Sequence, residues 1–73
     1  MAETSLYGPS RIQKYNNMTA QARINERQQD WAFAAKMWRQ AMAVAQELHW
    51  SDKIEWCSNR AAFCDGMAKR AAS

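Results

Sequence analysis

The stretch from residue 30 to residue 44, DWAFAAKMWRQAMAV, constrains the fold of this 73-residue chain more than any other part of the sequence. Large aromatic and small alanine side chains recur in it at steps of three and four residues, which places them on one face of a helix. The residues that follow this spacing are Trp31, Ala34, Trp38, Ala41 and Ala45. Such an alternation of bulky and small side chains is typical of a helix that a second helix approaches closely. We therefore expect Trp31, Ala34, Trp38 and Ala41 in a helical core.

The sequence before this stretch has a weaker helical pattern. Residues 1–9 lack periodicity and end in Gly-Pro, so they are expected to form a flexible lead-in. A first helix is predicted from Ser10, as its N-cap, to about Arg27. Asn16 and Asn17 are poor helix formers, so the order of this helix in the free protein stays open.

Two stronger helical patterns follow. The second predicted helix covers residues 31–50, with Asp30 as its N-cap, and the third begins at Ser51. Gly66 is expected to end the firm part of the third helix. No strand pattern is present, so the sequence predicts an all-α fold with one three-helix domain over residues 10–73.

The second predicted helix carries more apolar surface than one neighbour covers. Beside its first apolar face lies a second stripe, formed by Phe33, Met37, Val44 and Leu48. Together the two stripes cover about 200° of the circumference, whereas packing on one helix requires about 100°. The helix must therefore touch at least two other elements. The second stripe is either a surface for a partner protein or is covered by the third helix, and both readings stay open.

The third predicted helix repeats this arrangement. Its core-facing seam contains Ile54, Cys57, Ala61 and Cys64. We interpret a further stripe of this helix as partner-binding, because tryptophan and methionine are enriched at interfaces. It contains Trp56, Phe63 and Met67, with Arg60 beside them. Arg60 either pairs with an acidic group of a partner or lies across a neighbouring aromatic ring, and the second reading is favoured. Unsatisfied apolar stripes on a chain this small predict a homodimer.

The chain contains few groups that could carry chemistry. Its two cysteines are seven residues apart on one predicted helix, about 10 Å, which exceeds the ~7 Å limit for a disulfide. Reduced cysteines used as small apolar residues fit a cytosolic protein. The single histidine, His49, has no identifiable catalytic partner, and no metal-ligand or glycine-rich phosphate motif is present. The sequence predicts no catalytic residue, metal or cofactor, and we do not expect an enzyme.

Charge and hydropathy narrow the class of partner. The net charge is +3, without a dense stripe of lysine and arginine, so binding to nucleic acid stays open but is not indicated. No apolar run approaches the ~18–20 residues that cross a bilayer, and no signal-peptide pattern follows Met1. We therefore expect a cytoplasmic protein that does not bind membranes and acts by binding another protein.

Two resemblances to known families refine this expectation. The spacing of Trp31, Ala34, Trp38 and Ala41 after a short turn resembles the second half of a tetratricopeptide-type hairpin. The pattern has no second copy, so a solenoid is excluded. The resemblance implies a tetratricopeptide-like helical hairpin plus a third helix.

The second resemblance covers about residues 12–68. The pattern DW–x–x–AA–x–x–W–x–x–A, followed after a polar loop by W–x–x–x–R–x–x–FC, is similar to the AraC negative regulator family of enteric bacteria and their phages. The matching residues are Asp30, Trp31, Ala34, Ala35, Trp38, Ala41, Trp56, Arg60, Phe63 and Cys64. The resemblance implies a small cytoplasmic regulator that binds an AraC-type virulence activator and blocks it, without being an enzyme.

Two alternative functions stay open. The PerC-like activators have a similar W–x–x–AA–x–x–W helix and a later R–x–x–x–C-type ending, and they imply a transcriptional activator or a nucleoid-protein antagonist. Such a protein would act through the basic residues of the first segment, Arg11, Lys14, Arg23 and Arg27. The other alternative is a small helical adaptor that holds a peptide in a tetratricopeptide-like groove.

Overall fold

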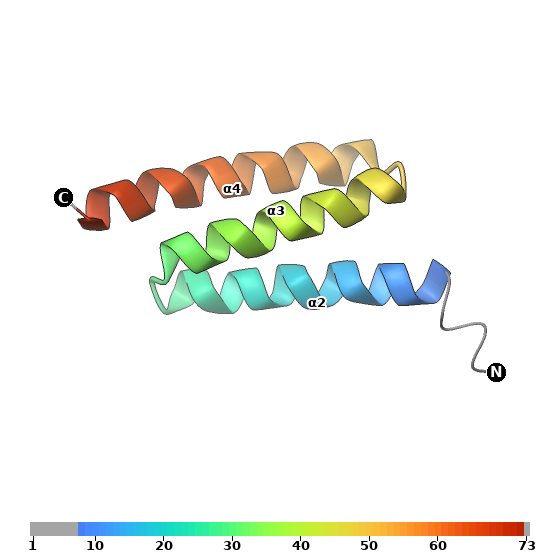
Figure 1. Cartoon of the computed structure of the whole chain (residues 1–73), viewed down its shortest axis with the longest axis horizontal. Coiled ribbons are helices and arrows are strands. Elements are labelled where there is room, and N and C mark those ends of the chain that lie inside the picture. The colour runs from blue at the N-terminus through green and yellow to red at the C-terminus, as the bar shows by residue number, and fades with distance from the viewer. Residues whose placement is uncertain (1–7, 73) are drawn as a thin grey trace.

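The computed structural model describes residues 8–72, which fold into the helices α2, α3 and α4 (Figure 1). Helix α2 covers Gly8–Arg27, α3 covers Trp31–Glu47 and α4 covers Ser51–Ala72. No strand occurs within these residues, so the predicted all-α, three-helix fold is confirmed.

Helix α3 is the central element. It packs against both α2 and α4, whereas α2 and α4 do not pack closely along each other. Successive helices run antiparallel, so α2 and α4 point in the same direction on either side of α3 (Figure 1). The expectation that the second helix touches two other elements is confirmed. Long side chains, described below, connect α2 to α4.

The two connections between helices have the same backbone geometry. Gln29 follows α2 with a φ of 62°, and His49 follows α3 with a φ of 57°. The Gln29 N–H donates to the carbonyl oxygen of Glu26 at 2.9 Å, and the Asp30 N–H donates to that of Asn25 at 2.8 Å. In the second connection, the His49 N–H donates to the carbonyl oxygen of Gln46 at 3.2 Å, and the Trp50 N–H donates to that of Ala45 at 3.0 Å. This pattern is the Schellman motif, which usually has glycine at the left-handed position. Each connection therefore reverses the chain within three residues but holds a non-glycine residue in a costly conformation.

The start of α2 differs from the sequence prediction. The helix begins at Gly8, before the expected cap Ser10, so Gly8 and Pro9 belong to it. A proline in the first turn is tolerated because the N–H groups there have no intrahelical partner. The rest of the predicted lead-in, residues 1–7, lies outside the described residues.

Three details of α3 and α4 also differ. Helix α3 ends at Glu47, so residues 48–50 form the connection to α4. Asp30 occupies the N-cap position, but its side chain makes no capping hydrogen bond; its backbone carbonyl accepts the Ala34 N–H at 2.9 Å. Helix α4 does not end at Gly66 but continues to Ala72. The methionine, alanine, lysine and arginine residues after this glycine are strong helix formers and offset its cost of about 1 kcal/mol.

The core lies between α3 and its two neighbours, and Trp38 is its largest fully buried side chain. Six of the predicted core residues are buried: Ala34, Trp38, Ala41, Cys57, Ala61 and Cys64. The other two, Trp31 and Ile54, are partly buried and pack against this cluster. Helix α2 adds the buried residues Tyr15, Thr19, Ala22 and Asn25. The first helix is thus an integral part of the packed fold.

Candidate protein-interaction surface

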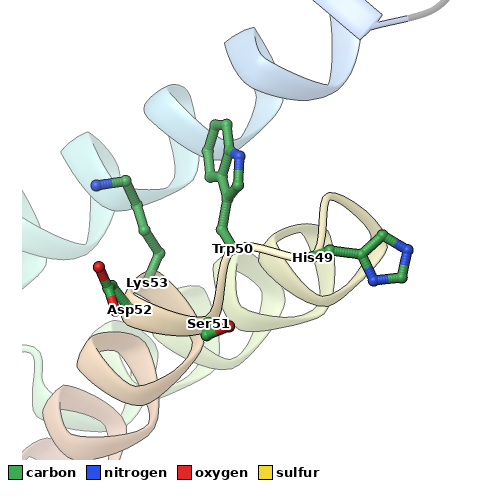
Figure 2. A pocket seen from close by; sticks show the side chains of 5 residues that line it. All are labelled: His49, Trp50, Ser51, Asp52 and Lys53. Carbon is green, nitrogen blue, oxygen red and sulfur yellow. The ribbon is translucent and has the colours of Figure 1, made fainter.

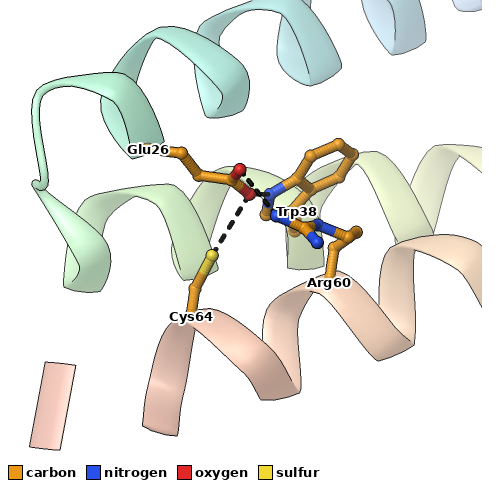
Figure 3. A network of polar contacts seen from close by, with 4 residues as sticks. All are labelled: Glu26, Trp38, Arg60 and Cys64. Atoms are coloured by element: carbon orange, nitrogen blue, oxygen red, sulfur yellow. Dashed lines mark hydrogen bonds and ion pairs between the residues drawn. The ribbon is translucent and has the colours of Figure 1, made fainter. Parts of the chain in front are cut away.

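One carboxylate connects the three helices. Glu26, near the end of α2, accepts at Oε2 the indole N–H of Trp38 on α3, with an N–O distance of 2.6 Å. The same oxygen accepts the Cys64 thiol at 3.3 Å, and Oε1 accepts Nη2 of Arg60 at 2.7 Å, both from α4. Figure 3 shows the three donors converging on the carboxylate. We call these four residues the Glu26 cluster.

The charges of the Glu26 cluster are largely shielded and are satisfied within it. The exposed fractions of the Glu26 and Arg60 side chains are 16% and 29%. Burial alone would raise the pKa of Glu26, but the three hydrogen bonds it accepts and the Arg60 charge favour the carboxylate, and the net effect lowers the pKa. Burial, together with the hydrogen bond to Glu26, raises the pKa of Cys64 to about 11. At neutral pH the cluster therefore holds a carboxylate and a protonated thiol.

Arg60 is also held between two aromatic rings of its own helix. The centre of its guanidinium group lies 4.8 Å from the ring centroid of Phe63 and 5.8 Å from that of Trp56. The favoured reading, that Arg60 lies across the neighbouring rings, is confirmed. Its acidic partner is Glu26 of this same chain, which the sequence prediction did not include.

Trp56 and Phe63 are half exposed, with exposed fractions of 48% and 47%. Edge-on contacts with α3 fix their orientation: Trp56 meets Trp38 at a centroid distance of 6.3 Å, and Phe63 meets Trp31 at 5.9 Å. Met67, about one turn beyond Phe63, is partly exposed. We call Trp56, Arg60, Phe63 and Met67 the α4 stripe. It is an aromatic surface in which contacts with α3 and with Glu26 hold Trp56, Phe63 and Arg60 in place.

The second predicted stripe, on α3, is mostly covered. Val44 is only 5% exposed, so its prediction as a partner-binding residue is wrong. It lines a groove between α2 and α3 together with Met18, so α2 is the helix that lies beside it. Met37 and Leu48 are partly buried and pack against the core. Of the four residues of this stripe, Phe33 is the one that is exposed, with an exposed fraction of 42%.

Both cysteines are reduced and buried, as predicted. The Cys57 Sγ lies 3.7 Å from the Tyr15 hydroxyl oxygen, which makes a second side-chain link between α2 and α4. Burial raises the pKa of Cys57, and burial together with the contact to Cys57 raises the pKa of Tyr15 to about 12. These groups therefore stay protonated at neutral pH and act as packing and hydrogen-bonding groups.

The connection between α3 and α4 borders a small pocket (Figure 2). Trp50 extends toward α2, where its ring meets that of Tyr15 edge-on at 5.4 Å, while His49 points away from the helices (Figure 2). His49 forms no ion pair with any residue in the described range. No group of three potential metal ligands occurs in residues 8–72 either. We interpret this pocket as a surface hollow beside the connection between α3 and α4, and not as a binding site.

Glu26 is the central residue that the sequence pattern did not reveal. It lies on the same face of α2 as Tyr15, Thr19 and Ala22, at steps of three and four residues. A buried indole N–H requires an acceptor. A carboxylate spaced along α2 like the core residues was therefore a signal that Glu26 could accept from a buried tryptophan. Identifying the donors required knowing that the end of α2 lies beside the middle of α4.

No known protein family, curated protein or solved structure matches the chain. Within residues 8–72, none of the helices is long and apolar enough to cross a membrane. The likeness to the AraC negative regulators is therefore one of residue pattern alone, and the exposed surface is the feature that bears on function.

Proposed function

We propose that the chain is a cytoplasmic regulator of transcription that binds an AraC-type virulence activator and blocks its dimerisation or its binding to DNA. Eight of the ten residues that carry the resemblance to the AraC negative regulators fall into two groups. One group is buried: Ala34, Ala35, Trp38, Ala41 and Cys64. The other reaches the surface on α4 and includes Trp56, Arg60 and Phe63. The pattern thus combines a scaffold with a surface that this scaffold orients.

The α4 stripe is the observation that carries the proposal. Tryptophan, phenylalanine, methionine and arginine are the side chains enriched at protein interfaces. Here Arg60 is already oriented by Glu26 and by the two rings beside it. Binding would therefore order few additional side chains, which favours affinity.

A homodimer is part of the same proposal. Phe33 follows Trp31 by two residues, which is about 200° around α3, so it points away from the ring contact between Trp31 and Phe63. Phe33 is therefore an exposed aromatic residue outside the α4 stripe, and one of the two surfaces would serve a second copy. Light scattering at several concentrations tests this: a monomer throughout the range would contradict the dimer without touching the proposed activator binding.

The function is tested by calorimetric titration of an AraC-type activator with the full chain. The double variant Trp56→Ser/Phe63→Ser is expected to lose affinity by at least about tenfold, because hot-spot aromatics account for much of the energy of an interface. Ile24→Ser, which changes an equally apolar residue exposed to 42% on α2, serves as the control and should bind normally. Circular dichroism establishes that both variants keep their helices. Equal affinity of the double variant and the wild type would refute the proposed surface.

A further inference from the structure

A groove runs between α2 and α4, beside the α4 stripe. It has a volume of about 380 Å³ and is lined by Tyr15, Asn16, Thr19, Arg23, Lys53 and Trp56. Tyr15 and Thr19 are buried and form its floor, while the other lining side chains are exposed. We call it the α2–α4 groove. Because Trp56 belongs both to the groove and to the α4 stripe, the two surfaces are continuous.

The ionisable groups at the rim of the groove are cations. Arg23 comes from α2 and Lys53 from α4, and no carboxylate lines the groove. Neither forms an ion pair with a described residue; the Lys53 ammonium group instead lies 6.0 Å from the ring centroid of Trp50. Three other arginines are paired, Arg11 with Glu47, Arg39 with Asp65 and Arg60 with Glu26. The groove therefore offers two available positive charges next to a half-exposed indole.

We propose that the α2–α4 groove binds an acidic segment of a partner protein, with carboxylates paired to Arg23 and Lys53 and an apolar side chain packed against Trp56. This inference rests on the proposed function and deepens it, because it names the chemistry of the partner segment. A segment with acidic and apolar residues on one face contacts the groove and the α4 stripe at once.

The arrangement of charges favours a protein segment over a nucleic-acid strand. A strand carries a phosphate at every nucleotide and is held by a row of cations. Along α4 beyond Trp56, the next cation is Arg60, and it is already paired with Glu26. A continuous phosphate chain would meet this carboxylate, whereas a protein segment needs only one or two acidic residues at the groove.

The test uses a dye-labelled amphipathic helical peptide of leucine and glutamate, as long as α2 (20 residues), and a matched peptide with glutamine in place of glutamate. Fluorescence anisotropy measures the binding of each to the full chain. The variants are Arg23→Gln and Lys53→Gln. The control is Lys14→Gln, which removes an exposed cation from the groove between α2 and α3.

The glutamate peptide should bind more tightly than the glutamine peptide. Each groove variant should weaken its binding by about twofold to fivefold, and added salt should weaken it further, because these ion pairs are partly exposed. Lys14→Gln should leave the affinity unchanged. Equal affinity for the two peptides, or an equal effect of the control, would overturn the inference. Tighter, Arg23-dependent binding of a single-stranded oligonucleotide would overturn it in favour of nucleic acid.

The same variants separate this inference from the proposed function. If an AraC-type activator binds through the α4 stripe but is insensitive to Arg23→Gln and Lys53→Gln, the groove proposal fails and the function stands. If the acidic peptide binds as described but no such activator does, the groove proposal stands and the function fails.

Discussion

The indole Nε1 of Trp38 and the carboxylate Oε2 of Glu26 are joined by a hydrogen bond of 2.6 Å between two helices of the fold. Trp38 is the largest fully buried side chain, and its one polar atom would otherwise lie without an acceptor in the core. The same carboxylate oxygen accepts the Cys64 thiol, and the other accepts Arg60. One side chain of α2 therefore satisfies the buried indole of the core and fixes Arg60 within the α4 stripe.

Substitution of this residue should be strongly destabilising. Glu26→Gln keeps the shape of the side chain but removes the charge that satisfies Arg60, and it presents an N–H to groups that are themselves donors. We expect the free energy of unfolding to fall by about 2–4 kcal/mol, measured by urea denaturation. The matched control is Glu47→Gln, since Glu47 pairs with Arg11 at 3.6 Å but both side chains are more than half exposed. Its effect should stay within about 0.5 kcal/mol. Equal losses for the two variants would contradict the role of the Glu26 cluster.

Stability should fall in acid, and the Glu26 cluster should contribute to this fall. The pKa of Glu26 in the folded chain is lowered from its ordinary value of 4.5. Between the two pKa values the unfolded chain binds more protons than the folded chain, so stability rises with pH in this window. The contribution is complete well above pH 4.5 and is lost as the pH falls through the folded value. Urea denaturation at a series of pH values should give a shallower dependence for Glu26→Gln than for the wild type. Parallel curves in this window would show that Glu26 does not titrate as described.

The helices and most of the core could be predicted because they depend on periodicity. The steps of three and four from Trp31 to Ala45 admit one helical face, and the excess apolar surface of this helix required two neighbours. The prediction that Val44 binds a partner is wrong. Periodicity shows that an apolar stripe must be covered, but it does not show whether a partner protein or another helix of the same chain covers it. Because α2 contains weak helix-forming residues, the sequence did not indicate that this helix lies beside Val44.

The candidate surface was predicted in part. The exposure of Trp56 and Phe63 follows from their position about 100° from the seam of α4. The link from Arg60 to Glu26 spans 34 positions in the sequence, and it depends on the end of α2 and the middle of α4 both reaching the Trp38 indole. No local pattern contains this information, because it arises from how two connections turn the chain.

Both thiols should react slowly with Ellman's reagent in the folded chain. Cys57 and Cys64 are buried, and the pKa of Cys64, about 11, leaves roughly a hundredfold less thiolate at neutral pH than the ordinary value of 9.0. Reaction should be complete only in denaturant. A Ser58→Cys variant places a thiol on the exposed side of α4 and should react within the mixing period as a control. Rapid modification of two thiols in the native wild type would mean that the core opens readily or that its packing differs.

Glycine at the left-handed position of either connection should stabilise the fold. Gln29 has a φ of 62° and His49 a φ of 57°, a region in which a side chain costs about 1–2 kcal/mol. Gln29→Gly and His49→Gly remove this strain, and the greater freedom of glycine in the unfolded chain offsets part of the gain. We expect each variant to raise the free energy of unfolding by up to about 1 kcal/mol in urea denaturation. Gln28→Gly is the matched control, because Gln28 is equally exposed but does not have a positive φ. That variant should lose stability, since there glycine adds only freedom to the unfolded state. If Gln29→Gly and Gln28→Gly destabilise the chain alike, the Schellman geometry at this connection is incorrect.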